Sequence, residues 1–161
     1  MNSTQFNDIV DNHSDNVYRF IYKSIKNQDD AKDVVQEAFS RLWKNKDSVD
    51  PEKAKSYLFS TAYHVMIDDI RKRKREKIID EYETNKHFHN EQYSDLKEVL
   101  NKAIDTLPDI QKNVILLRDY EGYSYKEIGD ITNLSESQVK VYIFRARKAL
   151  KDLIGKMENV I

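Results

Sequence analysis

The stretch that decides the fold is "SYKEIGDITNLSESQVKVYIFRARKALK", residues 124–151. Ser124 and Glu127 have the spacing of a capping box, in which each side chain accepts a hydrogen bond from the other residue's backbone N–H. Ser135 and Gln138 repeat that spacing further along. Asn133, which lies between the two boxes, tolerates the left-handed backbone that a tight turn requires. These signals predict two capped helices joined by a short turn, a helix-turn-helix.

The second of these helices has two different faces when its residues are placed 100° apart. An apolar face is formed by Val139, Ile143, Ala146, Leu150 and Leu153. The other side mixes bases with exposed apolar residues, which suits a DNA major groove: the apolar groups meet thymine methyls while polar groups reach base edges or phosphates. The DNA-facing candidates are Ser137, Gln138, Lys140, Val141, Phe144, Arg145 and Lys148. The other interpretation is a structural helical hairpin whose Phe144 packs on a neighbouring segment.

The composition indicates an all-α protein. The 161 residues include only 3 Gly and 2 Pro, and long stretches carry helical periodicity. No run approaches the roughly 18 apolar residues of a membrane span, and the polar N-terminus excludes an ordinary secretory signal. The chain has no Cys, so disulfides and thiolate metal sites are excluded. We therefore expect a cytoplasmic protein without membrane insertion.

Upstream of the helix-turn-helix, three further helices are expected before residue 78. Apolar stripes at helical spacing run through residues 6–21, 31–42 and 54–65. The third helix opens at Asp50-Pro51, where an acidic cap precedes proline at the first helical position. Residues 79–94 lose this periodicity and are polar, as in a flexible linker. The expected fold is therefore two small helical domains, 1–78 and 95–161, joined by the linker 79–94, with the helix-turn-helix in the second.

Charge is distributed unevenly along a chain whose net charge is only −1. "RKRKREK", residues 71–77, and residues 137–151 each carry a net charge of +5 by sequence, whereas acids gather at residues 29–37. Two basic patches suggest two contacts with a polyanion, and the acidic face suggests a different, basic partner. The alternative for each run is an ordinary solvated face.

Three segments resemble RNA polymerase sigma factors of the extracytoplasmic-function (ECF) group. "LPDIQKNVILLRDYEGYSYKEIGDITNLSESQVKVYIFRARKALK", residues 107–151, looks like the C-terminal domain, whose helix-turn-helix reads the promoter −35 element. "DDAKDVVQEAFSRLWKN", residues 29–45, and "SYLFSTAYHVMIDDIRKRKR", residues 56–75, resemble the N-terminal domain. The order of the segments also matches that family, over nearly the whole chain.

The resemblance implies partners and site residues. It implies docking on the β′ clamp helices and β flap of core RNA polymerase, recognition of promoter DNA, and restraint by an anti-sigma factor. The β′ contact falls on Asp30, Asp33, Gln36 and Glu37. The third helix and the loop at about 47–56 hold the melted −10 strand, because aromatic rings stack on bases and cations hold phosphates. The −10 candidates are Phe59, Tyr63, His64, Arg71 and Arg73. Taken without the resemblance, Phe59 and Tyr63 would instead be core residues of the third helix.

Two positions depart from the family pattern. His64 stands where the family often has asparagine, and "VKVY" (residues 139–142) replaces the commoner "VKSR". The side chains that read the two promoter elements therefore differ from the common pattern.

The predicted function is that of a sigma factor, which binds core polymerase and directs transcription initiation. One alternative is a stand-alone helix-turn-helix repressor or activator, which would bind a palindromic duplex without polymerase. Another is a protein–protein adaptor, which would not need its basic residues. No enzyme is expected, because the sequence has no phosphate loop or nucleophile motif. We expect no cofactor and no metal: His87 and His89 lie in the linker without a spaced third ligand.

Overall fold

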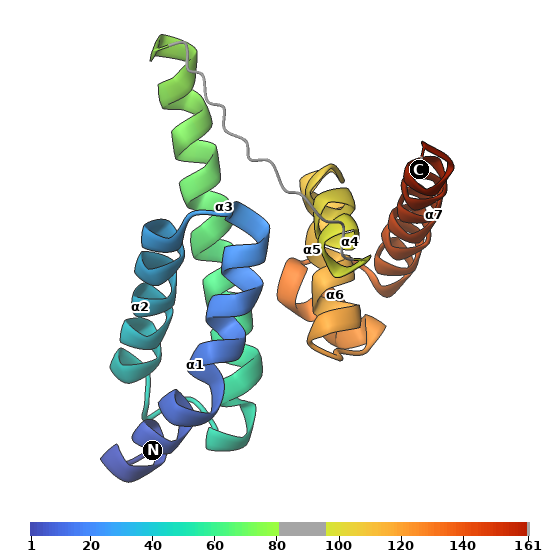
Figure 1. Ribbon diagram of the computed structural model, residues 1–161. Coiled ribbons are helices and arrows are strands. Elements are labelled where there is room, and N and C mark those ends of the chain that lie inside the picture. The colour runs from blue at the N-terminus through green and yellow to red at the C-terminus, as the bar shows by residue number, and fades with distance from the viewer. Residues whose placement is uncertain (81–95, 161) are drawn as a thin grey trace.

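The computed structural model describes residues 1–80 and 96–160, and all the regular elements in these two ranges are helical. Figure 1 shows two groups of helices along the chain. The N-terminal unit contains α1 (Ser3–Ile25), α2 (Gln28–Lys44), the single 3₁₀ turn η1 (Pro51–Lys53) and α3 (Ala54–Asp80). The C-terminal unit contains α4 (Leu96–Asp105), α5 (Asp109–Ile115), the π-helical turn η2 (Leu116–Tyr120), α6 (Tyr125–Thr132) and α7 (Glu136–Val160).

Local sequence signals begin each helix of the N-terminal unit. Asn2 caps α1 in a capping box with Gln5, and the Asn27 side chain accepts from the backbone N–H of Asp30 at the start of α2. Asp50 accepts from the N–H of Glu52 and precedes the proline, as the sequence predicted. The proline opens η1, which runs directly into α3.

The core of the N-terminal unit forms where α1, α2 and α3 pack together. The interior residues include Val17, Phe20, Ile21, Ala31, Val34, Ala38, Leu42, Ala54, Leu58 and Ala62. On α2, Val34 is fully buried while its neighbour Val35 is only partly buried. Figure 1 shows the end of α3 extending beyond α1 and α2. The basic tract of residues 71–76 on this part of α3 is therefore exposed.

The C-terminal unit packs α4, α5 and α6 against α7. Val139, Ile143, Ala146 and Leu150 of α7 are buried, as the apolar face of the sequence predicted. The chain turns after η2 at Gly122, whose φ of 76° is in the left-handed region and favours glycine. The described helices of both units include none that is long and apolar enough to cross a membrane.

The proposed linker 79–94 falls mostly on residues 81–95, outside the described ranges, together with the His87–His89 pair. Ile79 and Asp80 belong to α3, so this helix passes the proposed boundary at residue 78.

Candidate nucleic-acid interface

The helix-turn-helix forms as its capping signals predict. The Ser124 hydroxyl accepts from the Glu127 N–H at 3.1 Å, and the Glu127 carboxylate accepts from the Ser124 N–H at 2.8 Å. Ser135 and Gln138 make the same pair of bonds at 3.1 and 2.9 Å. Asn133 ends α6 with a left-handed φ of 61°. The angle between α6 and α7 is therefore fixed by local chemistry at both helix starts and at the turn.

Gly129 allows the close approach of the turn to α6. A Cβ atom at this position would lie 2.6 Å from the backbone carbonyl oxygen of Leu134. The carbonyl belongs to the turn backbone and cannot move aside as a flexible side chain would. Glycine is unfavourable in a helix interior, and this close approach explains its presence at position 129.

The outward face of α7 is open to solvent. Phe144 is 69% exposed and Val141 is 45% exposed, which is unusual for large apolar side chains. A shallow groove of about 200 Å³ runs along this face. Its lining residues are Ser137, Gln138, Val141, Tyr142 and Arg145. All seven candidate −35 residues are exposed, so the structure brings them together on one accessible surface.

Two of these seven side chains also have partners within the protein. The Gln138 side-chain oxygen accepts the capping hydrogen bond from the Ser135 N–H. Its NH₂ group is therefore the part of the side chain that can donate to DNA. The Lys140 ammonium lies 3.6 Å from the Glu136 carboxylate, one helical turn away, and 5.7 Å from the centre of the Tyr125 ring. Both groups of the ion pair are more than half exposed, so this contact contributes little to stability and leaves Lys140 available to a phosphate.

The acidic face of α2 is only partly available. Asp33 and Gln36 are exposed. The Glu37 carboxylate is 2.8 Å from the Arg41 guanidinium. Asp30 forms an ion pair with Arg73 of α3, so one candidate polymerase contact is joined to one candidate −10 contact. This hydrogen bond with Asp30 is the main cause that raises the pKa of Arg73.

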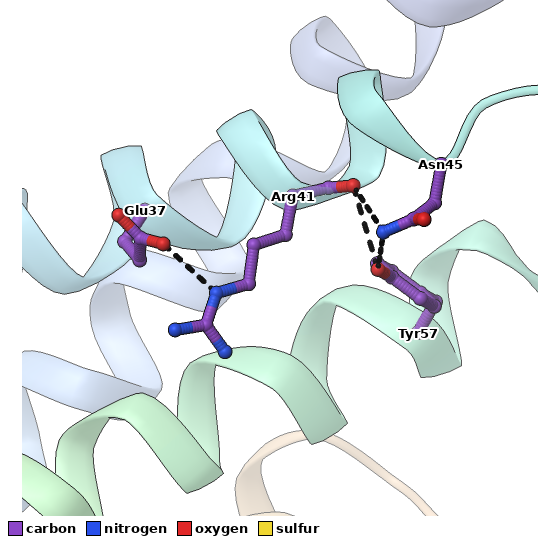
Figure 2. Close-up of polar contacts among 4 residues, drawn as sticks. All are labelled: Glu37, Arg41, Asn45 and Tyr57. Carbon is purple, nitrogen blue, oxygen red and sulfur yellow. Dashed lines mark hydrogen bonds and ion pairs between the residues drawn. The ribbon is translucent and has the colours of Figure 1, made fainter.

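A polar clip that the sequence analysis did not identify joins the end of α2 to the start of α3. Figure 2 shows the Asn45 amide donating to the Arg41 carbonyl at 2.9 Å and to the Tyr57 hydroxyl at 3.1 Å. The clip holds the two ends of the α2–α3 loop together. An asparagine after the last helical residue was the only local signal, and nothing in the sequence paired it with Tyr57.

This loop forms one wall of a cavity of about 380 Å³. The opposite wall belongs to α6. The N-terminal unit contributes Ser48, Val49, Asp50, Lys53, Ser56, Tyr57 and Ser60, and α6 contributes Glu127, Asp130 and Ile131. Acidic side chains of the helix-turn-helix thus stand opposite the loop that the family resemblance assigned to the −10 strand.

The five candidate −10 residues lie in different environments. Arg71 and Arg73 are exposed and His64 is partly buried. Phe59 is fully buried, with its ring 5.7 Å from Phe20 of α1 and 5.3 Å from Tyr123 beyond η2. Only 6% of Tyr63 is exposed, and burial raises the pKa of its hydroxyl. The structure therefore does not present the two aromatic residues to solvent.

The two units are connected by polar contacts between residues far apart in sequence. The Arg19 guanidinium donates two hydrogen bonds of 3.1 Å to the Glu121 carboxylate. The Ser24 hydroxyl donates to the Asn113 amide oxygen at 2.7 Å, and the Lys112 ammonium donates to the Ser24 carbonyl at 2.8 Å. Burial raises the pKa of Glu121, against the opposing effect of Arg19.

Comparison with known proteins matches both units. The model of Sigma-70 region 2 matches residues 9–76, and that of Sigma-70 region 4 matches residues 97–150. The chain is 34% identical over 157 residues to the ECF RNA polymerase sigma factor SigM of Bacillus subtilis, covering 94% of this chain and 96% of that protein. It is 32% identical to the RNA polymerase sigma factor SigV of the same organism, covering 91% and 89%.

A solved structure matches the arrangement of the whole chain. It is the sigma factor RpoE in complex with the anti-sigma factor NepR from Bartonella quintana, with a TM-score of 0.79 at 25% identity. The match covers 93% of this chain and 96% of that one. With both sigma-70 regions present in order, and relatives matched over almost their full length, the chain belongs to the ECF family of RNA polymerase sigma factors, which direct transcription initiation.

Proposed function

We propose that the two units divide promoter recognition between them. Residues 1–78 bind core polymerase and the melted −10 strand, and residues 95–161 read the −35 duplex. The strongest support is the outward face of α7, which is exposed to solvent and carries both basic and apolar side chains. Capping boxes at the starts of α6 and α7 hold this helix in place. Direct readout by a helix-turn-helix requires such a face, since its second helix enters the major groove and contacts the base edges.

Within the −35 surface, the side chains have different tasks. Val141 and Phe144 meet thymine methyls, and Lys140, Arg145 and Lys148 hold phosphates or base edges. Ser137 offers a hydroxyl at the edge of the same groove. Gln138 contributes only its amide donor, because its oxygen caps α7. An acceptor on a base edge or phosphate is therefore its expected partner.

The −10 strand is held by the basic end of α3 and by the α2–α3 loop. Arg71 and Arg73 supply positive charge, and His64 lies between them and the loop along α3. On the loop's side, the cavity wall has hydroxyls and Lys53 beside Asp50. The hydroxyls and Lys53 suit an unstacked base and its phosphate once α6, with its two carboxylates, has moved away. Phe59 and Tyr63 stack on bases only after the helices that cover them have moved away.

Core polymerase binds the acidic face of α2. Asp33, Gln36 and Glu37 face solvent or lie at its edge, and a basic surface such as the β′ clamp helices suits them. Asp30 belongs to the same proposed contact, and its ion pair with Arg73 must be shared with or given up to the polymerase. Region 4 makes the second polymerase contact, with the β flap.

An anti-sigma factor is the proposed regulatory partner. The support is the whole-chain likeness to a sigma factor solved in complex with one. The protein acts by binding and not by catalysis, and it works in the cytoplasm with the polymerase that it recruits.

Run-off transcription with purified core polymerase and genomic promoter fragments tests the proposed function. We expect transcripts of defined length only when this protein is added. Replacement of the −35 sequence and of the −10 sequence of an active fragment should each abolish them. Transcription that survives either replacement would contradict the proposed division of roles.

A further inference from the structure

The groove on the outward face of α7 brings an amide next to an apolar wall. It has a volume of about 200 Å³ and is lined by Ser137, Gln138, Val141, Tyr142 and Arg145. The last four of these residues stand at positions i, i+3, i+4 and i+7 of the helix, so they share one face. Along this face the apolar residues lie one turn after the amide and one turn before the guanidinium. A base that enters the groove can therefore meet a polar and an apolar group at once.

The capping box fixes what the Gln138 amide offers to this groove. Its side-chain oxygen accepts from the Ser135 N–H at 2.9 Å, while its backbone N–H donates to the Ser135 hydroxyl at 3.1 Å. Only the oxygen can accept from an N–H, so the amide cannot turn over without losing the cap. The usual contact of glutamine with adenine needs both the oxygen and the NH₂ group. Gln138 thus presents a donor to a base and cannot read adenine in the usual way.

Val141 and Tyr142 give the groove its apolar surface. Val141 is 45% exposed, and side chains on a helix lean towards its N-terminus, so the Val141 methyl groups lie over the turn that contains Gln138. Tyr142 is partly buried against the core of the C-terminal unit, and its ring is held beside Val141. A hydrogen-bond donor thus stands next to a surface that suits one small apolar group.

Among the four bases, only thymine matches this pair of groups. In the major groove thymine presents the O4 acceptor and the C5-methyl group, which stand on neighbouring ring atoms. Cytosine and adenine present an amino donor where thymine has O4, and guanine has acceptors but no methyl group. Two donors that face each other both lose a partner, which is costly in a contact without water.

We propose that this groove is a thymine pocket within the −35 surface. The Gln138 NH₂ group donates to thymine O4, and Val141 with Tyr142 encloses the C5-methyl group of the same base. This inference rests on the proposed role of α7, and it adds Tyr142 to the residues that read DNA. Positions 141 and 142 are those at which "VKVY" departs from the commoner "VKSR". The pocket therefore belongs to this chain and not to the common pattern.

Removal of single methyl groups tests the pocket directly. The probe is a promoter fragment whose transcription depends on its −35 element. Each −35 thymine of either strand is replaced in turn by deoxyuridine, which pairs with adenine as thymine does and lacks only the methyl group. The protein is used as holoenzyme with core polymerase, and affinity is measured by competition with a fluorescein-labelled fragment at one salt concentration. We expect about fourfold weaker binding when the thymine in the pocket is replaced.

Two variants show whether Val141 is responsible. Val141→Ala removes most of the apolar wall, so at one thymine the difference between thymine and deoxyuridine should disappear. Lys148→Ala is the matched control, because Lys148 is exposed on the same helix and its charge acts on phosphates. This control should weaken binding to all fragments alike and keep the difference. The absence of any thymine whose methyl effect depends on Val141 would overturn the proposal.

Exchange of the donor for an acceptor gives an independent test. Gln138→Glu keeps the capping box, in which glutamate serves as well as glutamine, but it has no NH₂ group. A carboxylate accepts from the N4 donor of cytosine. The parent should prefer thymine over cytosine at the pocket position by about tenfold or more, and the variant should reverse that preference. The added negative charge weakens binding to both fragments and leaves their ratio unchanged.

The outcomes separate the pocket from the proposed function. A Gln138→Glu variant that keeps the preference of the parent for thymine would refute the contact with O4. If transcription by the parent holoenzyme depends on the −35 element but deoxyuridine is bound as tightly as thymine at every position, the pocket alone is refuted. If replacement of the whole −35 element changes nothing, the proposed role of α7 fails instead.

Discussion

Single residues set the geometry of the DNA-reading surface. The two capping boxes and the left-handed Asn133 were predicted from the sequence, because each depends on a local backbone requirement that few residue types meet. The family resemblance placed Phe59 at the −10 strand, whereas the residue taken alone favoured the core, where it lies. Its helix has apolar residues on two sides, and the periodicity of a helix does not say what covers its second side.

Gly129→Ala should destabilise the C-terminal unit by about 1–3 kcal/mol, because the new Cβ overlaps the Leu134 carbonyl and the turn must shift. The measurement is urea unfolding followed by circular dichroism. Gly155→Ala is the matched control, because its Cβ meets nothing within 4 Å. Alanine in a helix interior should raise the free energy of unfolding by about 0.5–1 kcal/mol. Equal effects of the two variants would contradict the close approach.

Phe144→Ala should separate DNA reading from stability. The side chain is 69% exposed, so its removal should change the free energy of unfolding by no more than about 0.5 kcal/mol. Loss of its contact with the major groove should still reduce run-off transcription from a promoter that needs its −35 element. A variant with unchanged transcription would remove Phe144 from the proposed surface.

For single helices, the periodicity of apolar residues predicts which side is buried. It says nothing about what the outer side contacts, which only the residue types on that side suggest. For α7, the predicted core face is buried and the predicted outer face is exposed. The Asn45–Tyr57 clip joins two elements, and such pairs cannot be identified from one sequence.

Asp33→Lys with Glu37→Lys should weaken binding to core polymerase by about tenfold or more, which corresponds to ~1.4 kcal/mol. A basic partner surface then meets like charges. Both positions are on the outer side of α2, so the circular dichroism spectrum should not change. Binding is measured by titration of core polymerase into fluorescently labelled protein.

The matched control places the same charges on another helix. Asp8→Lys with Asp11→Lys changes two exposed positions of α1 and should leave the affinity for core polymerase unaltered. If both double variants weaken binding equally, net charge and not the α2 face is responsible.

At the scale of the whole molecule, the sequence predicted two helical units and their order but not their contact. The hydrogen-bonded residues that join the units lie 88 to 102 positions apart in the sequence: Arg19 pairs with Glu121, and Ser24 pairs with Lys112 and Asn113. Each is an ordinary polar residue in its own helix. Long-range pairs of this kind leave no local pattern, so the packing of Tyr123 on Phe59 became visible only in the structure.

Run-off transcription measures whether this chain gives core RNA polymerase its promoter specificity. Purified core polymerase should produce no discrete transcripts from genomic promoter fragments alone. With the protein added, transcripts should start at defined positions downstream of −35 and −10 elements. Absence of stimulated initiation on every fragment, from folded protein that still binds core polymerase, would contradict the account.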